Sequence, residues 1–324
     1  MNPVLSVENL SVAFGAVSAI EEVNLSVHRG EFLGLVGESG SGKSVTGFSI
    51  MKLLDEPGHI TGGRILFNGR DLAQQSEPGM RRLRGKRIAM IFQDPMMTLN
   101  PVLRIDTQMV ETVLAHDKVS RREAWERARD ALGMVGIPSP EERLAAYPHE
   151  FSGGMRQRVA IAIAMLHRPD LIIADEPTTA LDVTIQAQIL SEVQKLAQGS
   201  GTAMIWITHD LSVVAGLAQR LAVMYAGRVV ETGPTEDVLD RTLHPYSLGL
   251  IRSVPSRNSR GQRLFQIPGM PMATGRRPQG CPFHPRCDRA TAACLEMPAE
   301  REITRGHVTR CHHPETSLKG EKVA

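Results

Sequence analysis

The sequence predicts an α/β fold built around a mixed or parallel β-sheet, with helices inserted between two of its strands. Four short and almost uniformly apolar runs are typical of strands buried on both faces: residues 32–36, 88–92, 171–174 and 203–207. A long polar, helix-prone stretch separates the second run from the third. The composition also changes after about residue 250, which indicates a separate C-terminal part.

The N-terminal region predicts further strands. Residues 4–36 alternate β-rich runs, VLSVENLSV, AIEEVNLSV and FLGLV, with turn signals at Phe14-Gly15 and Arg29-Gly30. The last of these runs is the first of the four apolar ones. We therefore expect the chain to enter the main sheet at residue 32, after two earlier strands.

The stretch from about residue 104 to 166 predicts helices. Within it, SRREAWERARDALGMV places small and apolar side chains at helical spacing, namely Ala124, Ala128, Ala131, Leu132 and Val135. An insertion of this kind adds a helical subdomain to the α/β domain, and we place its limits at about residues 95–167.

Composition restricts the classes of partner and the place where the chain works. The 324 residues include 37 Lys and Arg against 35 Asp and Glu, so the formal charge of +2 supplies no global field for gripping nucleic acid or an anionic bilayer. The apolar runs are far shorter than the roughly 20 residues that cross a bilayer. The start, MNPVLSVENL, lacks the basic and apolar regions of a secretion signal. We expect a cytoplasmic location.

Two domains are expected, residues 1–250 and 251–324. The second opens with SVPSRNSRGQRLFQIPGMPMATGRRPQG, whose Pro, Gly and Arg content predicts a linker or an irregular extension. All four cysteines lie within it, between Cys281 and Cys311. Their clustering favours a local set of ligands over a disulfide framework.

A glycine-rich loop follows the first apolar run. Residues 37–44, GESGSGKS, fit the pattern G-x-x-x-x-G-K-[ST] and precede a helix-forming segment. Glycines let backbone N–H groups turn inward around phosphate oxygens, and the helix adds its positive N-terminal end. Lys43 would reach the β and γ phosphates and Ser44 would bind Mg²⁺. The alternative is a chance glycine-rich turn. The expected nucleotide-binding residues are Gly37, Ser39, Gly40, Ser41, Gly42, Lys43, Ser44 and Val45.

Two carboxylates end the third apolar run. In LIIADEP the strand leads directly into Asp175 and Glu176. At such a strand end, P-loop NTPases hold Mg²⁺ with an Asp, while a neighbouring carboxylate can orient and polarise the attacking water. Adjacent residues of a strand face different ways, so one can serve each role. We assign Asp175 to the metal and Glu176 to the water, the alternative being a solvated turn.

A third segment resembles a family signature. Residues 151–158, FSGGMRQR, resemble the signature of the ABC (ATP-binding cassette) ATPases, whose usual form begins Leu-Ser-Gly-Gly-Gln. Phe151 and Met155 depart from that form, while Ser152, Gly153 and Gly154 keep its centre. The resemblance implies a P-loop NTPase core with an antiparallel β subdomain and a helical insertion. It also implies that this segment contacts the γ-phosphate of ATP held on a partner's P-loop, so that hydrolysis requires a head-to-tail dimer. Taken alone, the segment could be a helix capped by Ser152 without any ligand.

Further positions resemble functional residues of the same family. The resemblance implies that Phe14 stacks on adenine, that Gln93 is the Q-loop glutamine and that His209 contacts the γ-phosphate. Ala180-Leu181-Asp182 resembles the D-loop, which crosses the dimer interface. Singly, each has a plainer interpretation as a core, surface or structural residue. With these positions included, the expected Mg²⁺ ligands are Ser44, Gln93 and Asp175, and the expected catalytic residues are Glu176, His209 and Gln93.

Longer segments resemble the ATPase subunits of dipeptide, oligopeptide and nickel importers. They are FQDPMMTLNP (92–101), DVTIQAQ (182–188), MYAG (224–227) and HPY (244–246). This resemblance implies ATP-driven import of peptides, with two membrane-spanning permease subunits, an extracytoplasmic substrate-binding protein and a second, related ATPase subunit as partners. It also implies a peripheral position on the cytoplasmic face of the inner membrane.

The cysteine segment resembles the C-terminal extension of the same ATPases. Its spacing is Cys281-x5-Cys287-x6-Cys294-x16-Cys311. Four soft ligands indicate an iron–sulfur cluster or tetrahedral zinc, although the spacing lacks the paired C-x₂-C of many zinc sites. The resemblance favours a structural [4Fe-4S] cluster on all four cysteines. Zinc and reduced thiols in a small cap are the alternatives. Histidines that could replace a thiolate are His284, His307, His312 and His313.

Other functions stay open at this point. A soluble ABC ATPase usually carries two cassettes or a long coiled-coil insertion, and an exporter commonly fuses the cassette to membrane helices. This chain has one compact cassette and no long apolar segment. Among importers, nickel chelates or other small solutes are alternatives to peptides, because specificity would reside in the permease and the binding protein.

Overall fold

The computed structural model describes residues 2–178, 183–255, 258, 264–272 and 275–315. These residues form two compact units that alternate along the chain. The first unit is drawn from residues 1–4, 27–31 and 74–205, and the second from residues 5–26, 32–73 and 206–324. The domain boundary at residue 250 inferred from composition stays a prediction.

The first unit contains a pair of parallel strands. β6 (Ile88–Ile91) pairs with β7 (Leu171–Asp175), and Met90 lies opposite Ile173. Every residue of both strands is buried, as the uniformly apolar runs predicted. Because the strands are parallel, the loops that leave their C-terminal ends start at the same edge.

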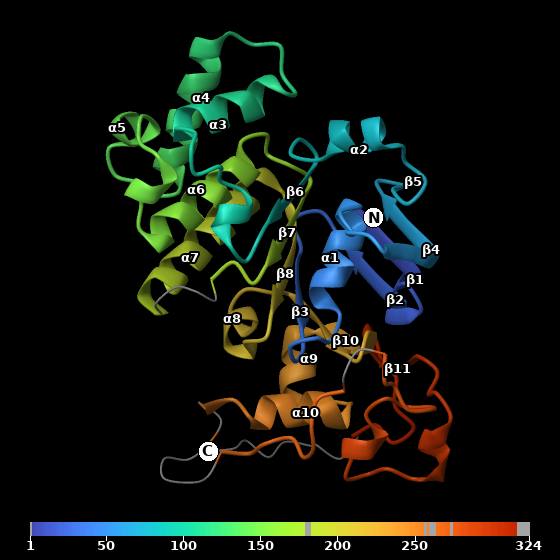
Figure 1. The fold of residues 1–324 in the computed structure, drawn as a ribbon. Coiled ribbons are helices and arrows are strands. Elements are labelled where there is room, and N and C mark those ends of the chain that lie inside the picture. The colour runs from blue at the N-terminus through green and yellow to red at the C-terminus, as the bar shows by residue number, and fades with distance from the viewer. Residues whose placement is uncertain (1, 179–182, 256–257, 259–263, 273–274, 316–324) are drawn as a thin grey trace. The chain divides into compact units, whose positions relative to one another are not determined.

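Helices make up most of the rest of the first unit, and Figure 1 shows α3, α4, α5, α6 and α7 gathered together. The predicted helical stretch at residues 104–166 is therefore confirmed. The helical segments are α2 (Glu77–Leu83), the 3₁₀ helices η1 (Pro95–Met97) and η2 (Pro148–Glu150), α3 (Ile105–Leu114), α4 (Arg121–Met134), α5 (Pro140–Leu144), α6 (Gly153–Met165) and α7 (Val183–Ser200).

Helix α4 shows how the sequence pattern becomes packing. The Ser120 hydroxyl accepts a hydrogen bond from the Glu123 N–H at 3.1 Å and so caps the first turn. The five residues predicted to share one face are all buried. Just beyond the helix, the Val135 carbonyl accepts a hydrogen bond from the buried Arg158 of α6 at 2.9 Å. Apolar packing and one buried cation thus hold α4 against α6.

The second unit contains an antiparallel sheet with the strand order β2-β1-β4-β5. β1 pairs with β4 over its whole length, from Leu5 opposite Phe67 to Phe14 opposite Gly58. The expected antiparallel β subdomain is thus present. Its strands are β1 (Leu5–Phe14), β2 (Val17–Val27, whose last residue belongs to the first unit), β4 (Gly58–Phe67) and β5 (Arg70–Asp71).

A mixed set of strands in the second unit runs in the order β11-β12-β10-β9-β3. β3 pairs with β9 in parallel, and the remaining pairs are antiparallel. β8 (Ala203–Thr208) is divided between the two units after Ile205. The bounds of the five are β3 (Phe32–Val36), β9 (Arg220–Tyr225), β10 (Arg228–Pro234), β11 (Arg301–Thr304) and β12 (His307–Thr309).

Strands β11 and β12 correct the expectation that the C-terminal extension is wholly irregular. β12 adds to the edge of β10, with Glu231 opposite Thr309. The helices of this unit are α1 (Lys43–Met51), α8 (Leu211–Ala215), α9 (Thr235–Asp240), α10 (Pro245–Arg252), η4 (His284–Arg286) and η5 (Ala292–Leu295). Over the described part of the chain, helices long and apolar enough to cross a bilayer are not found.

Candidate functional site

The glycine-rich loop joins β3 to α1 in the second unit. A Cβ on Gly37 would lie 2.2 Å from the Met224 carbonyl oxygen, so only glycine lets the loop pass this close to the end of β9. Gly40 and Gly42 have φ of 77° and 102°, a conformation that other residues seldom adopt. The glycines of the sequence pattern are therefore required by the path of the loop.

Lys43 and Ser41 point their polar groups at this loop. The Lys43 ammonium is buried and donates hydrogen bonds to the carbonyl oxygens of Gly37, at 2.8 Å, and Glu38, at 3.0 Å. The Ser41 hydroxyl is buried without a hydrogen-bond partner among the described residues. Among those residues, no side chain caps the N-terminus of α1 at Gly42. A buried cation, an unpaired hydroxyl and the positive end of a helix are what an anion such as phosphate requires.

The carboxylates lie in the first unit, at the end of β7. Asp175 is buried at 5% exposure, and Glu176 follows it with φ 44°. A glutamate in this left-handed region is uncommon, and such strained backbone clusters at functional sites. Gln93, two residues beyond β6, places its Nε2 3.5 Å from the Glu176 Oε2. The parallel pairing of β6 and β7 thus brings together two residues that the sequence identified separately.

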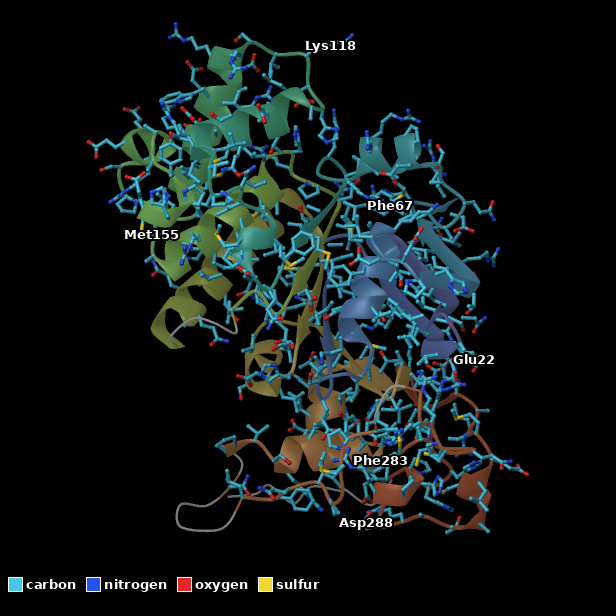
Figure 2. All side chains as sticks on the ribbon, in the orientation of Figure 1. Glu22, Phe67, Lys118, Met155, Phe283 and Asp288 are labelled. Carbon is cyan, nitrogen blue, oxygen red and sulfur yellow. The ribbon has the colours of Figure 1, made fainter. Side chains whose placement is uncertain are left out.

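The signature segment forms the first turn of α6, also in the first unit. The Ser152 hydroxyl accepts a hydrogen bond from the Met155 N–H at 3.3 Å and caps the helix. Ser152 and Gly153 are exposed, and a Cβ on Gly153 would meet nothing within 4 Å. Gly154 is half-buried. The body of α6 is buried while its N-terminal tip is open, and Figure 2 labels Met155 at this tip.

The remaining predicted residues fall in three places. Phe14 ends β1 and lies half-buried beside Gly58, whose Cβ position is 2.6 Å from the ring. His209 follows β8 directly and is exposed. Asp182 lies outside the described residues. Of the predicted positions, Phe14, residues 37–45 and His209 belong to the second unit, whereas Gln93, residues 152–154, Asp175 and Glu176 belong to the first.

The predicted metal centre of the C-terminal extension is not supported. The four cysteines are not joined by disulfides, and they line one cavity of about 10 Å³. Over the described ranges, no group of three or more His, Cys, Asp or Glu side chains is arranged to hold a metal ion. Burial raises the pKa of the thiols of Cys281, Cys287 and Cys311, the last to about 11. The thiolates that bind metals are thus disfavoured in this arrangement.

The histidines named as substitute ligands have other partners. His307 Nε2 lies 2.8 Å from Oε1 of the buried Glu231, and His284 Nδ1 lies 2.9 Å from the Cys281 carbonyl oxygen. His312 Nε2 lies 3.1 Å from the Glu296 carbonyl oxygen. His313 Nε2 lies 2.7 Å from the Thr291 hydroxyl. Each ring nitrogen that makes such a contact is committed to holding the fold of the extension.

Two neighbours of the glycine-rich loop were missed by sequence reasoning. The Tyr246 hydroxyl accepts a hydrogen bond from the Glu38 N–H at 2.8 Å. The Arg286 guanidinium binds the Glu38 carboxylate at 2.8 and 3.1 Å. The only signal for Tyr246 was its place in the family-like HPY segment, and Arg286 carried no signal in the spacing of the sequence.

Comparisons with known proteins identify the family of this chain. The family description "ABC transporter" matches residues 20–179, and "Oligopeptide/dipeptide transporter, C-terminal region" matches residues 230–294. The chain is 48% identical to the oligopeptide transport ATP-binding protein OppD of Escherichia coli K12, over 97% of this chain and 94% of that protein. It is 46% identical to the dipeptide transport ATP-binding protein DppD of the same organism, over 96% of each.

Solved structures show the same fold for the ATPase part. The dimeric ABC transporter cassette MJ0796 matches with a TM-score of 0.64 and 27% identity, over 71% of this chain and 98% of that chain. A dimeric post-hydrolysis state of that cassette, bound to ADP and Pi, matches equally well. With its glycine-rich loop, its strand-end carboxylates and these relatives, the chain belongs to the oligopeptide and dipeptide branch of the ABC transporter ATP-binding proteins and hydrolyses ATP.

Proposed function

We propose that this chain is the ATP-hydrolysing subunit that powers peptide import through an ABC transporter. The observation that carries the proposal is the similarity to oligopeptide and dipeptide transport ATP-binding proteins, which extends over almost the whole chain, including the C-terminal part. The glycine-rich loop supports a role in binding phosphate, because two of its carbonyl oxygens hold the Lys43 ammonium at the loop.

Phosphate binding is the role we propose for residues 37–45. The loop N–H groups and the N-terminus of α1 face the phosphates, and Lys43 moves from the loop carbonyls to the β and γ oxygens. Ser44, Asp175 and Gln93 would hold Mg²⁺, whose positive charge would offset the negative charge on those oxygens. Phe14 stacks on the adenine ring.

Hydrolysis is the role that we propose for Glu176, Gln93 and His209. The Glu176 carboxylate accepts a proton from the attacking water, and Gln93 positions the carboxylate and the water. His209 stabilises the γ-phosphate. The Gln93 Nε2 lies 3.5 Å from the Glu176 Oε2. The open helix tip at Ser152, Gly153 and Gly154 completes the ATP site of a second ATPase subunit, and Asp182 lies at the interface between the two.

Transport follows from differential affinity. ATP favours the closed pair of ATPase subunits because it contacts both, and loss of the γ-phosphate removes that preference. We propose that closure moves two membrane-spanning permease subunits, which receive the peptide from an extracytoplasmic binding protein. The second ATPase is a paralogue, and the assembly lies on the cytoplasmic face of the inner membrane.

Co-purification and uptake test this proposal. The chain, extracted from membranes in detergent, is expected to bring two permease subunits with it, and vesicles containing that complex should take up oligopeptides only when ATP is supplied inside. Lys43→Ala is the matched negative control, because it removes the ammonium group that bonds the loop carbonyl oxygens, together with the rest of the side chain beyond Cβ. ATP-driven uptake of nickel without peptide uptake would favour the nickel importers, and absence of any permease would favour a soluble ATPase.

A second proposal concerns the four cysteines, for which we propose a structural [4Fe-4S] cluster, with zinc as the alternative. What supports the proposal is that four thiols line one cavity and that the His313 N–H donates to the Cys311 sulfur at 3.3 Å. Among the described residues no three His, Cys, Asp or Glu side chains are grouped as ligands of one metal ion, and the thiolates of an iron–sulfur cluster, which bind different irons, stand further apart than the ligands of a single zinc ion.

Metal analysis tests the cluster. Protein purified without oxygen should contain iron and sulfide and show visible charge-transfer absorption, and Cys294→Ser should lose both. Zinc in place of iron would reject the cluster, and metal-free protein with full stability would leave reduced thiols in a small cap.

A further inference from the structure

An ion pair joins the glycine-rich loop to the C-terminal extension. Glu38, the second residue of the loop, receives two hydrogen bonds from Arg286, from Nη1 to Oε2 at 2.8 Å and from Nη2 to Oε1 at 3.1 Å. Two parallel hydrogen bonds of this kind fix the orientation of the carboxylate, and the guanidinium neutralises its charge. Arg286 lies in η4, between Cys281 and Cys287 and 248 positions along the chain from Glu38. Both residues belong to the second unit.

Arg286 is held on all sides. Its side chain is 4% exposed, and Nε donates to the Pro268 carbonyl oxygen at 2.8 Å. Its Nη1 also lies 3.3 Å from the Tyr225 hydroxyl. The guanidinium stands 5.7 Å from the centre of the Tyr225 ring and 5.8 Å from that of Phe283. A cation packed this way presents one fixed geometry to Glu38.

The backbone of Glu38 is fixed as well. Its N–H donates to the Tyr246 hydroxyl at 2.8 Å, and its carbonyl oxygen accepts from the Lys43 ammonium at 3.0 Å. The rings of Tyr246 and Tyr225 are 4.5 Å apart between centroids, and both pack against Phe283. Figure 2 labels Phe283 among the crowded side chains of this region and Asp288 further out. The family-like MYAG and HPY segments thus supply Tyr225 and Tyr246, the two tyrosines that pack next to the loop.

We propose that Arg286 is a positioning residue for the phosphate loop: it acts through Glu38, whose negative charge it neutralises, so that the loop can receive the polyphosphate of ATP. The inference rests on the proposed role of residues 37–45 in phosphate binding. Without Arg286, the Glu38 carboxylate would stand unpaired in a loop that must accept a highly negative ligand. The segment that carries the cysteines is therefore part of the nucleotide site, and it contributes through this ion pair.

A charge-removal cycle tests the proposal by equilibrium titration of Mg-ATP onto the purified full-length chain. Arg286→Gln should raise the Kd for Mg-ATP roughly tenfold, the change expected when the half-buried Glu38 carboxylate loses its partner beside an anion site. Glu38→Gln in the Arg286→Gln background should restore the Kd to within about twofold of the unmodified protein. Arg286→Lys keeps the positive charge but cannot make the two parallel hydrogen bonds, so its Kd should fall between that of the unmodified protein and that of Arg286→Gln.

A purely structural role of Arg286 predicts a different pattern. If Arg286 only anchors the extension, the double variant binds Mg-ATP as weakly as Arg286→Gln, and the proposal is overturned. Arg289→Gln is the matched control, because Arg289 lies in the same segment and pairs with Glu315 instead of the loop. Its Kd should stay within about twofold of the unmodified value if the ion pair to Glu38 is what matters.

Two further outcomes separate this inference from the proposed site itself. Unchanged binding in Arg286→Gln with lost binding in Lys43→Ala overturns the inference and leaves the phosphate loop in place. Unchanged binding in both variants overturns the inference on Arg286 and the proposed phosphate-binding role of the loop. Where Arg286→Gln fails to fold, Glu38→Gln alone decides: it should bind Mg-ATP at least as tightly as the unmodified protein, and weaker binding would overturn the inference.

Discussion

The side-chain amide of Gln93 lies 3.5 Å from the carboxylate of Glu176, although the two residues are 83 positions apart in the chain. Both stand just beyond the ends of parallel strands, β6 and β7, and the pairing of those strands places them at one edge. Glu176 keeps φ at 44°, an uncommon backbone conformation for this residue type. An amide and a carboxylate fixed at such an edge can orient a water molecule between them and a phosphate.

The first prediction removes the proposed base. Glu176→Gln preserves the size of the side chain and its contact with Gln93 but cannot accept a proton, so kcat for ATP should fall by about a hundredfold or more while ATP still binds. Phosphate release and equilibrium ATP binding measure the two effects. Glu142→Gln, at an exposed position of α5, is the control and should leave kcat unchanged. A normal turnover rate in Glu176→Gln would remove this residue from the role of base.

The second prediction concerns Lys43. Its ammonium donates hydrogen bonds to two carbonyl oxygens of the loop. Because Lys43→Ala removes this ammonium, the variant should lose ATP binding and turnover together. Lys52, just beyond the end of the same helix, donates to the Ala73 carbonyl oxygen and is exposed. Lys52→Ala should therefore bind and hydrolyse ATP normally. Equal losses in the two variants would mean that the effect is one of stability.

A third prediction separates the two roles of Ser152, as a helix cap and as a contact to a partner's nucleotide. Ser152 and Ser120 each cap a helix of the first unit through their hydroxyls. Replacing either by Ala should lower the free energy of unfolding by about 1 kcal/mol. Only Ser152→Ala should also reduce the ATPase rate of the assembled transporter. If both variants lose activity in proportion to stability, Ser152 is a cap and nothing more.

The sequence was sufficient for features whose residues are contiguous or regularly spaced. The loop at residues 37–44 could be identified because its glycines, Lys43 and Ser44 are adjacent, and the buried face of α4 because its spacing follows the helix. The parallel strands were indicated by uniformly apolar runs, although β6 ends at Ile91 and not at residue 92.

What the sequence could not reveal depends on long-range pairing. Glu38 and Arg286 meet only because η4 and the loop lie together in the folded second unit, and no spacing records that contact. Strands β11 and β12, of four and three residues, are too short to show an alternating pattern, and β12 gains its stability from pairing with β10. Neither feature has a local signature that separates it from an irregular Pro- and Arg-rich tail.

The last prediction concerns the buried His244, which caps α10. Its Nδ1 accepts a hydrogen bond from the Tyr246 N–H at 3.0 Å, so the neutral ring with its proton on Nε2 is the form that fits. Burial lowers the pKa of His244 to about 4 from 6.5, and the nearby Glu231 only partly opposes this. Between these values the unfolded chain binds a proton that the folded chain does not. The contribution to stability is therefore complete above pH 6.5 and is lost as the pH falls toward 4.

His244→Asn isolates this effect, because Asn also caps helices well and does not titrate. Urea unfolding of both proteins at a series of pH values gives the difference in their free energies of unfolding. As the pH falls from 6.5 to 4, the unmodified protein should lose roughly 3 kcal/mol more than the variant, the energy that corresponds to its pKa shift. Carboxylates that titrate in the same range are present in both proteins and cancel in the difference. Parallel curves would show that His244 is protonated in the folded chain as readily as in the unfolded one, and the neutral cap would be wrong.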